Sequence, residues 1–375
     1  MHYLDNAATT RVLPEAAEAA VHAMCEGFGN PSSLHKMGIE ASRLLEDSRK
    51  TVASALGCLP EETYFTSCGT ESTNISLRGA AHLNRHKKGR IITTEIEHAA
   101  TLNTCKQLAA EGFDVVFLAP DETGHITPAA LEDALTADTI LLSCQLVNNE
   151  IGTVQPVAEL GALLKAKAPG ALFHIDAVQG LCRMPLTQKK WNCDLMSVSG
   201  HKIGAPKGIG ALYVKKGLRL PPLMFGGGQE KGMRPGTEPL PNIAAFAKAC
   251  EIRMSHFDED YAHVAELAAY LKEQAAANLP DAAFNGEGDV PHVVNLSIPG
   301  CKSEVMLRVL EGDEVYVSSG SACSKGKQSG VLKALGLPKA RTDSAIRVSF
   351  APFNTKEDVD AFIAAAQKGV KMLRR

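Results

Sequence analysis

The apolar positions along the chain recur with two different spacings, and these spacings alternate over its first half. Short runs rich in β-branched residues lie at 63–67, 90–94, 115–118 and 139–143. Windows with the helical spacing of apolar residues separate them, at 72–84, 99–111 and 127–135. Strands that alternate with helices in this way usually pair in parallel, with helices on both faces of the sheet. The pattern predicts an α/β fold built on a mostly parallel sheet.

The two ends of the chain follow other patterns. Residues 13–25 and 34–56 have the spacing of amphipathic helices, and an alanine-rich helical region runs from Pro239 to about residue 277. Beyond it, short strands are expected at 293–298, 315–317 and 346–350, with helices at 304–310 and 356–373. We therefore expect a large domain over residues 13–250 and a small α+β domain formed by residues 1–12 and 251–375.

Composition narrows the class of protein. The 375 residues are 45% hydrophobic and 22% charged, with a net charge of −3. Nucleic-acid binding is not expected, because no long basic run is present. The N-terminal residues lack the pattern of a signal peptide, and no apolar run is long enough to cross a membrane. These features predict a cytoplasmic protein.

The ten cysteines and twelve histidines do not form metal-binding patterns. No two cysteines have the C-x-x-C spacing, and no histidines have the H-E-x-x-H spacing. The sequence therefore predicts neither a metal site nor a disulfide framework, and most thiols should be reduced core residues.

Two apolar runs end in residues that suit one particular cofactor. Residues 195–198 are followed by Ser-Gly-His-Lys, which places Lys202 at the end of a predicted strand. Residues 171–179 form a second predicted strand, with Asp176 and Gln179 towards its end. A lysine that forms a Schiff base and a carboxylate that faces the ring nitrogen are what pyridoxal phosphate requires. The same segments would also suit two ordinary strands with a buried aspartate. Other segments are needed to choose between a pyridoxal phosphate site and this simpler interpretation.

Two further segments could bind a phosphate. Residues 66–73 lead from a strand into a helix through Gly69 and Thr70, where free backbone N–H groups favour anions. Simple helix capping is the more common reason for such residues before a helix. The glycine-rich residues 225–237 carry Thr237, although they would also suit a linker. Neither a P-loop nor a G-x-G-x-x-G motif is present, which disfavours nucleotide binding.

Cys323 lies in the most unusual stretch of the chain. The thirteen residues after Val317 include no bulky apolar side chain, which predicts a mobile loop with little to anchor it. Most free cysteines are buried and inert. Lys325 and Lys327 would favour the thiolate form here, so a swinging nucleophile is the alternative hypothesis.

Taken together, these segments resemble the NifS/IscS group of cysteine desulfurases, pyridoxal phosphate enzymes of the class V aminotransferase family. The resemblance covers nearly the whole chain and is carried by residues 3–10, 28–32, 94–98, 147–152 and 318–323. It implies fold type I of the pyridoxal phosphate enzymes, in which a seven-stranded sheet between helices forms the large domain.

The resemblance also implies roles for individual residues. Lys202 would hold the cofactor and serve as base, Cys323 would receive sulfur, and Arg347 would clamp the substrate carboxylate together with Asn149. His98 would stack on the cofactor ring and handle the proton of the Cys323 thiol. The remaining cofactor residues implied are Gly69, Thr70, Asn149, Asp176, Gln179, Ser199, His201 and Thr237.

The implied reaction converts L-cysteine to L-alanine and leaves a persulfide on Cys323 for an acceptor protein, either an iron–sulfur scaffold or a tRNA-thiolating enzyme. The implied assembly is a homodimer, in which Thr237 reaches the neighbouring phosphate site. Selenocysteine lyase, a class V aminotransferase and a sulfur-relay subunit of low activity remain as alternatives. Compared with the housekeeping members, the chain has a short loop after Cys323 and stops at Arg375 without their C-terminal extension, which leaves the acceptor open.

Overall fold

The computed structural model describes residues 1–86, 88–319 and 328–374. Its large sheet has seven strands, in the order β2-β8-β7-β6-β5-β3-β4. Their bounds are β2 Thr63–Thr66, β8 Gly210–Val214, β7 Leu195–Ser199, β6 Leu172–Asp176, β5 Thr139–Gln145, β3 Arg90–Thr94 and β4 Asp114–Leu118. Neighbouring strands pair in parallel except where β8 pairs antiparallel with β2 and with β7. The prediction of an α/β fold on a mostly parallel sheet is confirmed.

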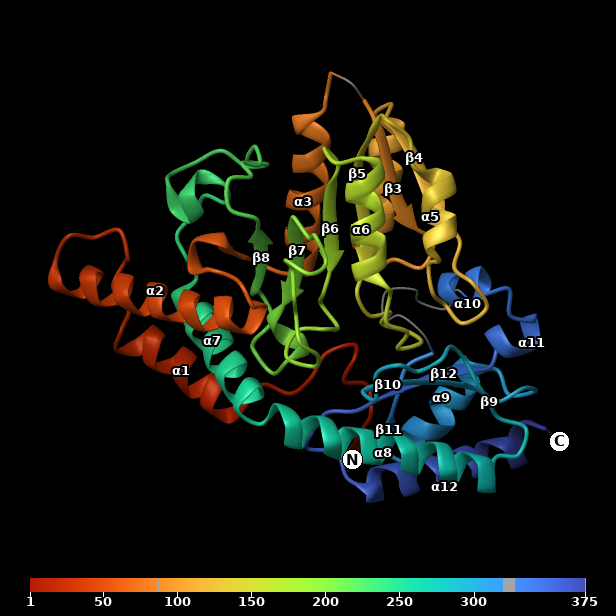
Figure 1. Ribbon diagram of the computed structural model, residues 1–375. Helices are drawn as coiled ribbons and strands as arrows, with labels where there is room; N and C mark the ends of the chain where they lie inside the picture. The colour runs from red at the N-terminus through yellow and green to blue at the C-terminus, as the bar shows by residue number, and fades with distance from the viewer. Residues whose placement is uncertain (87, 320–327, 375) are drawn as a thin grey trace.

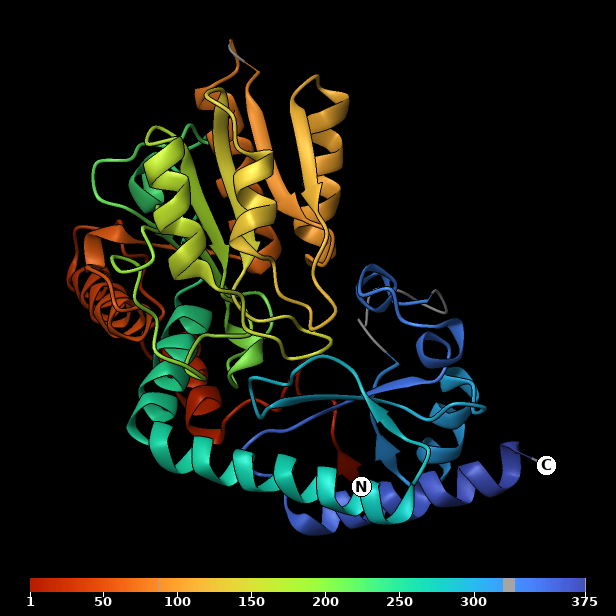
Figure 2. The ribbon, with the colours of Figure 1, turned by 45° about the vertical axis from the view of Figure 1, so that its right-hand side comes forward.

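Helices cover both faces of this sheet, as the alternation of strands and helices predicted (Figures 1 and 2). The helices on one face are α3 Gly69–Leu83 and α4 Ala99–Ala110, and those on the other are α5 Pro128–Ala134 and α6 Val157–Lys167. Because both faces are covered, the central strands are buried on both sides; β7, for example, is buried at all of its positions, including its two serines.

The alanine-rich region after Pro239 is two helices rather than one. Helix α7, Leu240–Ser255, packs against α1, Pro14–Cys25, and α2, Lys36–Leu56, while α8, Phe257–Asn278, packs against α12, Lys356–Leu373. His256 separates α7 from α8 with a non-helical backbone. The chain changes direction there because the two helices belong to different apolar clusters (Figure 1).

A second group of elements surrounds its own apolar cluster. It contains the antiparallel strands β9 Ala283–Phe284, β10 Val293–Ser297 and β12 Ala345–Ser349, with helix α9 Ser303–Gly312. Two short helices, α10 Gly330–Ala334 and α11 Lys339–Thr342, precede β12, and Val331 and Leu332 of α10 are buried in the apolar cluster of the large sheet. The N-terminal β1, His2–Tyr3, pairs in parallel with β11, Val315–Tyr316, and Leu4 is buried in the apolar cluster of the second group. The two ends of the chain thus pack together, although the domain limits 13–250 and 1–12 with 251–375 stay a prediction.

The described residues contain neither a membrane-spanning helix nor a metal-binding cluster. No helix among them is both long enough and apolar enough to cross a membrane. No cluster of three or more histidine, cysteine, aspartate or glutamate side chains in the same ranges is arranged to hold a metal ion.

Candidate active site

A cavity of about 270 Å³ lies where the strands of the large sheet end and the N-terminal segment crosses them. Ten of the residues singled out in the sequence line it: Gly69, Thr70, His98, Asn149, Asp176, Gln179, Ser199, His201, Lys202 and Arg347. Thr237 does not line it and is exposed on the segment before α7. Cys323 lies outside the described residues.

Lys202 ends the short 3-10 turn, Gly200–Lys202, that follows β7. Its Nζ donates to the carbonyl oxygens of Ala7 at 2.7 Å and Ala8 at 2.8 Å. Burial, together with the positive charges of Arg347 and Arg183, lowers the pKa of this amine from 10.5 to about 7. A large fraction of the amine is therefore neutral near pH 7 and able to attack a carbonyl group.

Asp176 is the last residue of β6 and is 6% exposed. Its Oδ1 accepts a hydrogen bond from the backbone N–H of Val178 at 3.0 Å. Burial raises the pKa of the carboxyl group, while the nearby His98 and Lys202 oppose this rise. A buried carboxylate in this position favours a cationic partner in the cavity, as a protonated ring nitrogen would be.

His98 occupies the position before α4, where its Nδ1 accepts the N–H of Ala100 at 3.1 Å. A neutral ring must then carry its proton on Nε2. Burial lowers the pKa of His98, which favours this neutral form. The ring lines the same cavity as Asp176 and Lys202.

The start of α3 has the properties of an anion site. The residue before it, Cys68, makes no side-chain cap, so the first N–H groups of the 15-residue helix stay available. Thr73, one turn into α3, has a buried Oγ1 without a hydrogen-bond partner among the described residues. A Cβ on Gly69 would lie 2.9 Å from Cγ2 of Val178, so the backbone approaches the turn after β6 more closely there than other residue types allow.

Ser199 and His201 lie beside this helix start. Nδ1 of His201 is 3.1 Å from Oγ1 of Thr9, and burial together with the charge of Lys202 lowers the pKa of His201 to about 4. A neutral histidine and a serine hydroxyl can both donate to phosphate oxygens.

Arg347 reaches the cavity from β12 and is 1% exposed. Its Nη1 donates to the carbonyl oxygen of Asn149 at 2.8 Å, and its Nη2 donates to Oδ1 of Asp5 at 2.7 Å. The backbone of Arg347 forms a bridge with Ser318, five positions before Cys323. The arginine therefore lies close to the start of the segment that contains the cysteine.

Sequence reasoning missed several residues of the site. Asp5, the carbonyl oxygens of Ala7 and Ala8, and the arginine at position 183 all contact residues of the cavity. Residues 3–10 carried part of the family resemblance, which marked the segment but gave no roles. No sequence signal identifies a backbone carbonyl as an acceptor, because every residue has one.

The residues present fit pyridoxal phosphate. The uncapped start of α3 and the unpartnered Thr73 hydroxyl suit its phosphate, the buried Asp176 suits its ring nitrogen, and the largely neutral Lys202 suits its aldehyde.

Comparisons with known proteins agree with this chemistry. The model of the aminotransferase class-V family matches residues 2–362. A cysteine desulfurase of Trichormus azollae is 40% identical over 99% of this chain and 93% of its own length. A solved NifS-like protein is 37% identical, with a TM-score of 0.93 and 99% of each chain covered. The structure described as SspA in complex with cysteine is 34% identical, with a TM-score of 0.83 over 95% of this chain and all of that one.

Proposed function

This chain belongs to the aminotransferase class-V family, and from that premise we propose that it is a pyridoxal phosphate-dependent L-cysteine desulfurase. The observation that carries the proposal is the convergence of Lys202, Asp176 and Arg347 on one cavity. These side chains supply an amine for the cofactor aldehyde, a carboxylate for the ring nitrogen and a guanidinium for the substrate carboxylate. The full-length similarity to cysteine desulfurases supports the choice of substrate.

In this proposal each group around the cavity has a defined part in holding the cofactor. The start of α3, with Gly69 and Thr70, holds the phosphate together with Ser199 and His201. Asn149 and Gln179 would hold the phenolic oxygen of the bound cofactor, and His98 would stack on its ring. When bound, pyridoxal phosphate supplies a ring that accepts electrons from the bonds at the substrate α-carbon.

The protein residues then bind the substrate and move its protons. Arg347 binds the carboxylate of L-cysteine, and the neutral Nζ of Lys202 takes the proton from the α-carbon. The thiolate of Cys323 attacks the substrate sulfur, so that an S–S bond forms as the C–S bond breaks. His98 can take the proton of the Cys323 thiol only if its Nδ1 gives up the N–H of Ala100, because the neutral ring carries its own proton on Nε2. The balance is cysteine plus a protein thiol giving alanine plus a protein persulfide, and no external oxidant is needed.

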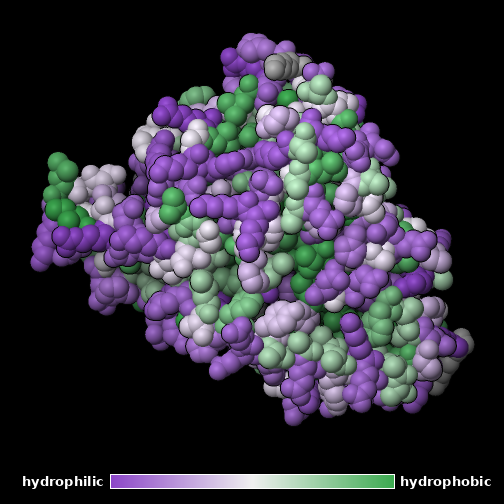
Figure 3. All heavy atoms as spheres, viewed as in Figure 1, coloured by the Kyte–Doolittle hydropathy of each residue, from purple (hydrophilic) through white to green (hydrophobic). Residues whose placement is uncertain are grey.

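We also propose a homodimer, because large apolar side chains are exposed on the loop that joins α1 to α2. Leu34 is 94% exposed and Phe28 64% exposed. The loop that carries them forms the projection on the left of Figure 1, and Figure 3 shows hydrophobic residues gathered at this tip. Phe225, 90% exposed, begins the segment that carries Thr237. A second copy of the chain would cover these residues and bring Thr237 to the phosphate site of its neighbour.

The sulfur acceptor in this proposal is another protein, either an iron–sulfur scaffold or a tRNA-thiolating enzyme. The proposal places the reaction in the cytoplasm, where thiols stay reduced. All nine cysteines among the described residues are free, which agrees with a reducing compartment.

The test is turnover of L-cysteine by the purified protein with a reductant, measured as alanine and sulfide. Lys202→Ala should abolish both turnover and the visible absorption band of the bound cofactor. Cys323→Ala should keep the band and stop sulfide release. Sulfide release by Cys323→Ala at the wild-type rate would exclude the role given to Cys323.

The same assay separates the alternatives. Much faster turnover of selenocysteine, tolerant of Cys323→Ala, would indicate a selenocysteine lyase. Pyruvate formation that depends on a keto acid would indicate an aminotransferase. Alanine production that requires an added acceptor protein would indicate a sulfur-relay subunit.

A further inference from the structure

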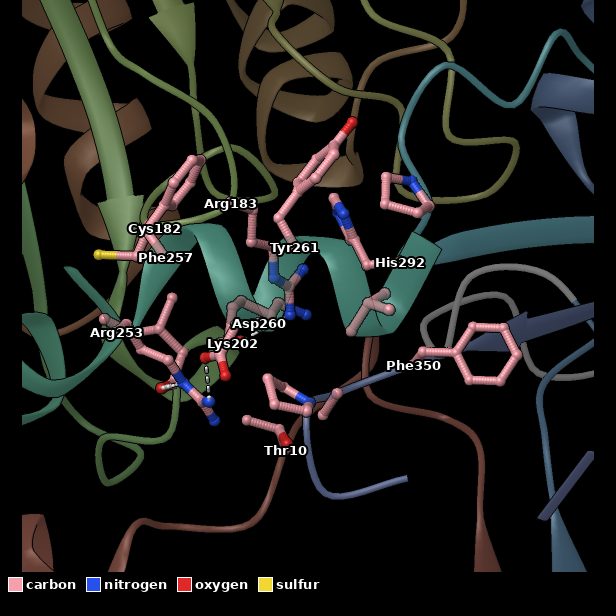
Figure 4. Close-up of a pocket in the computed structure, with 15 residues that line it drawn as sticks. Thr10, Cys182, Arg183, Lys202, Arg253, Phe257, Asp260, Tyr261, His292 and Phe350 are labelled. Carbon is pink, nitrogen blue, oxygen red and sulfur yellow. Dashed lines mark hydrogen bonds and ion pairs between the residues drawn. The ribbon is translucent and has the colours of Figure 1, made fainter. Parts of the chain in front are cut away.

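A second, smaller cavity shares Lys202 with the first. It has a volume of about 50 Å³ and lies between the end of α7, the start of α8 and the segment before β10. Figure 4 shows the polar side chains that line it, among them Arg183, Arg253, Asp260 and His292. Such a volume is too small for a substrate, so the interest of the cavity is the side chains that it contains.

Arg183 connects this second cavity to the residues of the active site. Its Nη1 donates to Oε1 of Gln179 at 2.6 Å, and its Nη2 donates to the carbonyl oxygen of Lys202 at 2.7 Å. One guanidinium group therefore holds both the main chain of the lysine and the side chain of a predicted cofactor residue. The fixed planar shape of the group makes the two bonds dependent on each other.

The bond to Arg183 determines how the amide of Gln179 is oriented. A guanidinium group has only donors, so the amide oxygen of Gln179 must face Arg183. The amide nitrogen of Gln179 donates to the carbonyl oxygen of Ala7 at 3.0 Å, and a carbonyl can only accept. Both contacts, with Arg183 and with the Ala7 carbonyl, require the same orientation of the Gln179 amide. The second N–H of the amide then remains available to donate a hydrogen bond into the cavity.

These contacts form a closed circuit. Arg183 donates to Gln179, Gln179 donates to the Ala7 carbonyl, and Nζ of Lys202 donates to that same carbonyl at 2.7 Å. The Lys202 carbonyl oxygen accepts from Arg183 and completes the ring of contacts. Lys202 is thus fixed at its backbone and at its amine by one network.

We infer that Arg183 is a positioning residue for the proposed reaction: it fixes the main chain of Lys202 and orients Gln179 as a hydrogen-bond donor toward the cofactor. The inference rests on the proposed function, because it is the cofactor that gives the orientation of Gln179 its purpose. Arg183 itself acts only through Gln179 and Lys202.

The charge of Arg183 affects the pKa of Lys202, and this effect can be measured separately from any effect of packing. After burial and Arg347, Arg183 contributes to the lowered pKa of the Lys202 amine, which lies at about 7. Removal of the charge should therefore raise the pH at which Lys202 loses its proton. Loss of packing without loss of charge should leave that pH nearly unchanged.

The experiment uses Arg183→Met, which removes the charge and the donors, and Arg183→Lys, which keeps the charge on a flexible ammonium group with three donors. Arg253→Met is the matched control, because Arg253 lines the same cavity but donates to Asp260 at 3.0 Å and to the Ile203 carbonyl. Circular dichroism and gel filtration establish that each variant is folded. All three are compared with the wild type.

The first measurement needs no cofactor. In the cofactor-free protein, the pH dependence of Lys202 acetylation is followed by mass spectrometry of the modified peptide. The midpoint should rise by about one pH unit in Arg183→Met. Arg183→Lys should restore most of the wild-type value. Arg253→Met should leave the midpoint nearly unchanged, because Asp260 already neutralises that arginine.

The second measurement uses the loaded protein. The pH midpoint of the visible cofactor band should rise in Arg183→Met, and the cofactor should bind about tenfold more weakly, which corresponds to one lost hydrogen bond of about 1.4 kcal/mol. A wild-type midpoint in Arg183→Met, or an equal shift in Arg253→Met, would overturn the role of Arg183. A wild-type protein without a visible band would instead refute the proposed function, and the acetylation measurement would still decide the role of Arg183.

Discussion

Nη2 of Arg347 donates to Oδ1 of Asp5 at 2.7 Å, and this ion pair joins the first residues of the chain to β12. The guanidinium is 1% exposed, its Nη1 is bonded to Asn149, and its Nε is buried without a partner among the described residues. Each Nη atom of this arginine already has one protein partner, so a substrate carboxylate in the cavity must share the guanidinium with these partners or replace one of them. Asp5, itself a carboxylate, is the partner most similar to the substrate.

The first prediction concerns the stability of this pair. Asp5→Asn leaves the buried Arg347 without its charged partner and should lower the free energy of unfolding of the cofactor-free protein by about 1–3 kcal/mol. Chemical denaturation measures the loss. In a double-mutant cycle with Arg347→Met, the two substitutions should couple by more than about 0.5 kcal/mol. Additive effects would show that the pair contributes nothing specific.

The second prediction concerns the contribution of Lys202 to the pH dependence of the free energy of unfolding. The folded-state pKa of about 7 lies below the ordinary 10.5, so the unfolded chain binds more protons between these values. The free energy of unfolding of the wild type should therefore rise with pH across this window relative to Lys202→Met. Allowing for partial exposure, we expect a relative gain of about 2 kcal/mol between pH 6.5 and 9.

Denaturation of the two proteins at several pH values measures this gain. Lys202→Met also loses the hydrogen bonds to the carbonyl oxygens of Ala7 and Ala8, but this loss is the same at every pH. It therefore does not change how the free energy of unfolding varies with pH. Parallel curves would mean that Lys202 titrates as an ordinary surface lysine.

The third prediction concerns Asp176. Asp176→Asn keeps the shape of the side chain but removes a buried charge, so the cofactor-free protein should lose no more than about 1 kcal/mol of stability. The loaded variant should form alanine about 100-fold more slowly, because a neutral amide does not keep the ring nitrogen protonated. Unchanged turnover would show that this carboxylate does not face the ring.

The fourth prediction concerns the phosphate site at the start of α3. Gly69→Ala places a Cβ 2.9 Å from the stiff side chain of Val178, and the local shift should weaken cofactor binding about tenfold. Gly170→Ala is the matched control, because a Cβ there meets no atom within 4 Å. Equal affinities in the two variants, measured by fluorescence titration, would contradict the phosphate role of this turn.

The sequence predicted most of the elements because their apolar spacing is local. Helix α12, Lys356–Leu373, and strand β3, Arg90–Thr94, have the expected bounds, whereas β6 ends at Asp176, three residues before the end of the expected run at 171–179. Strand β8, Gly210–Val214, was missed. Its antiparallel direction depends on the connection from β7, which has no crossover helix, and a short apolar run does not reveal that.

The site could be predicted as a set of residues but not as an arrangement. The strand ends at Asp176 and Lys202 followed from pattern, and the remaining roles came from resemblance. Thr237 and Cys323 stay predictions, since one lies away from the cavity and the other lies outside the described residues.

The sequence by itself therefore determined the α/β class, the strand ends that carry Asp176 and Lys202, and the kind of cofactor those side chains suit. Only the tertiary structure showed that Asp5 pairs with Arg347 and that backbone carbonyl groups accept from the Lys202 amine. It also showed that Arg183 donates both to the Lys202 carbonyl and to the Gln179 side chain. These contacts link residues that are up to 342 positions apart. Local periodicity carries no information at such separations, because the packing of the whole chain brings the partners together.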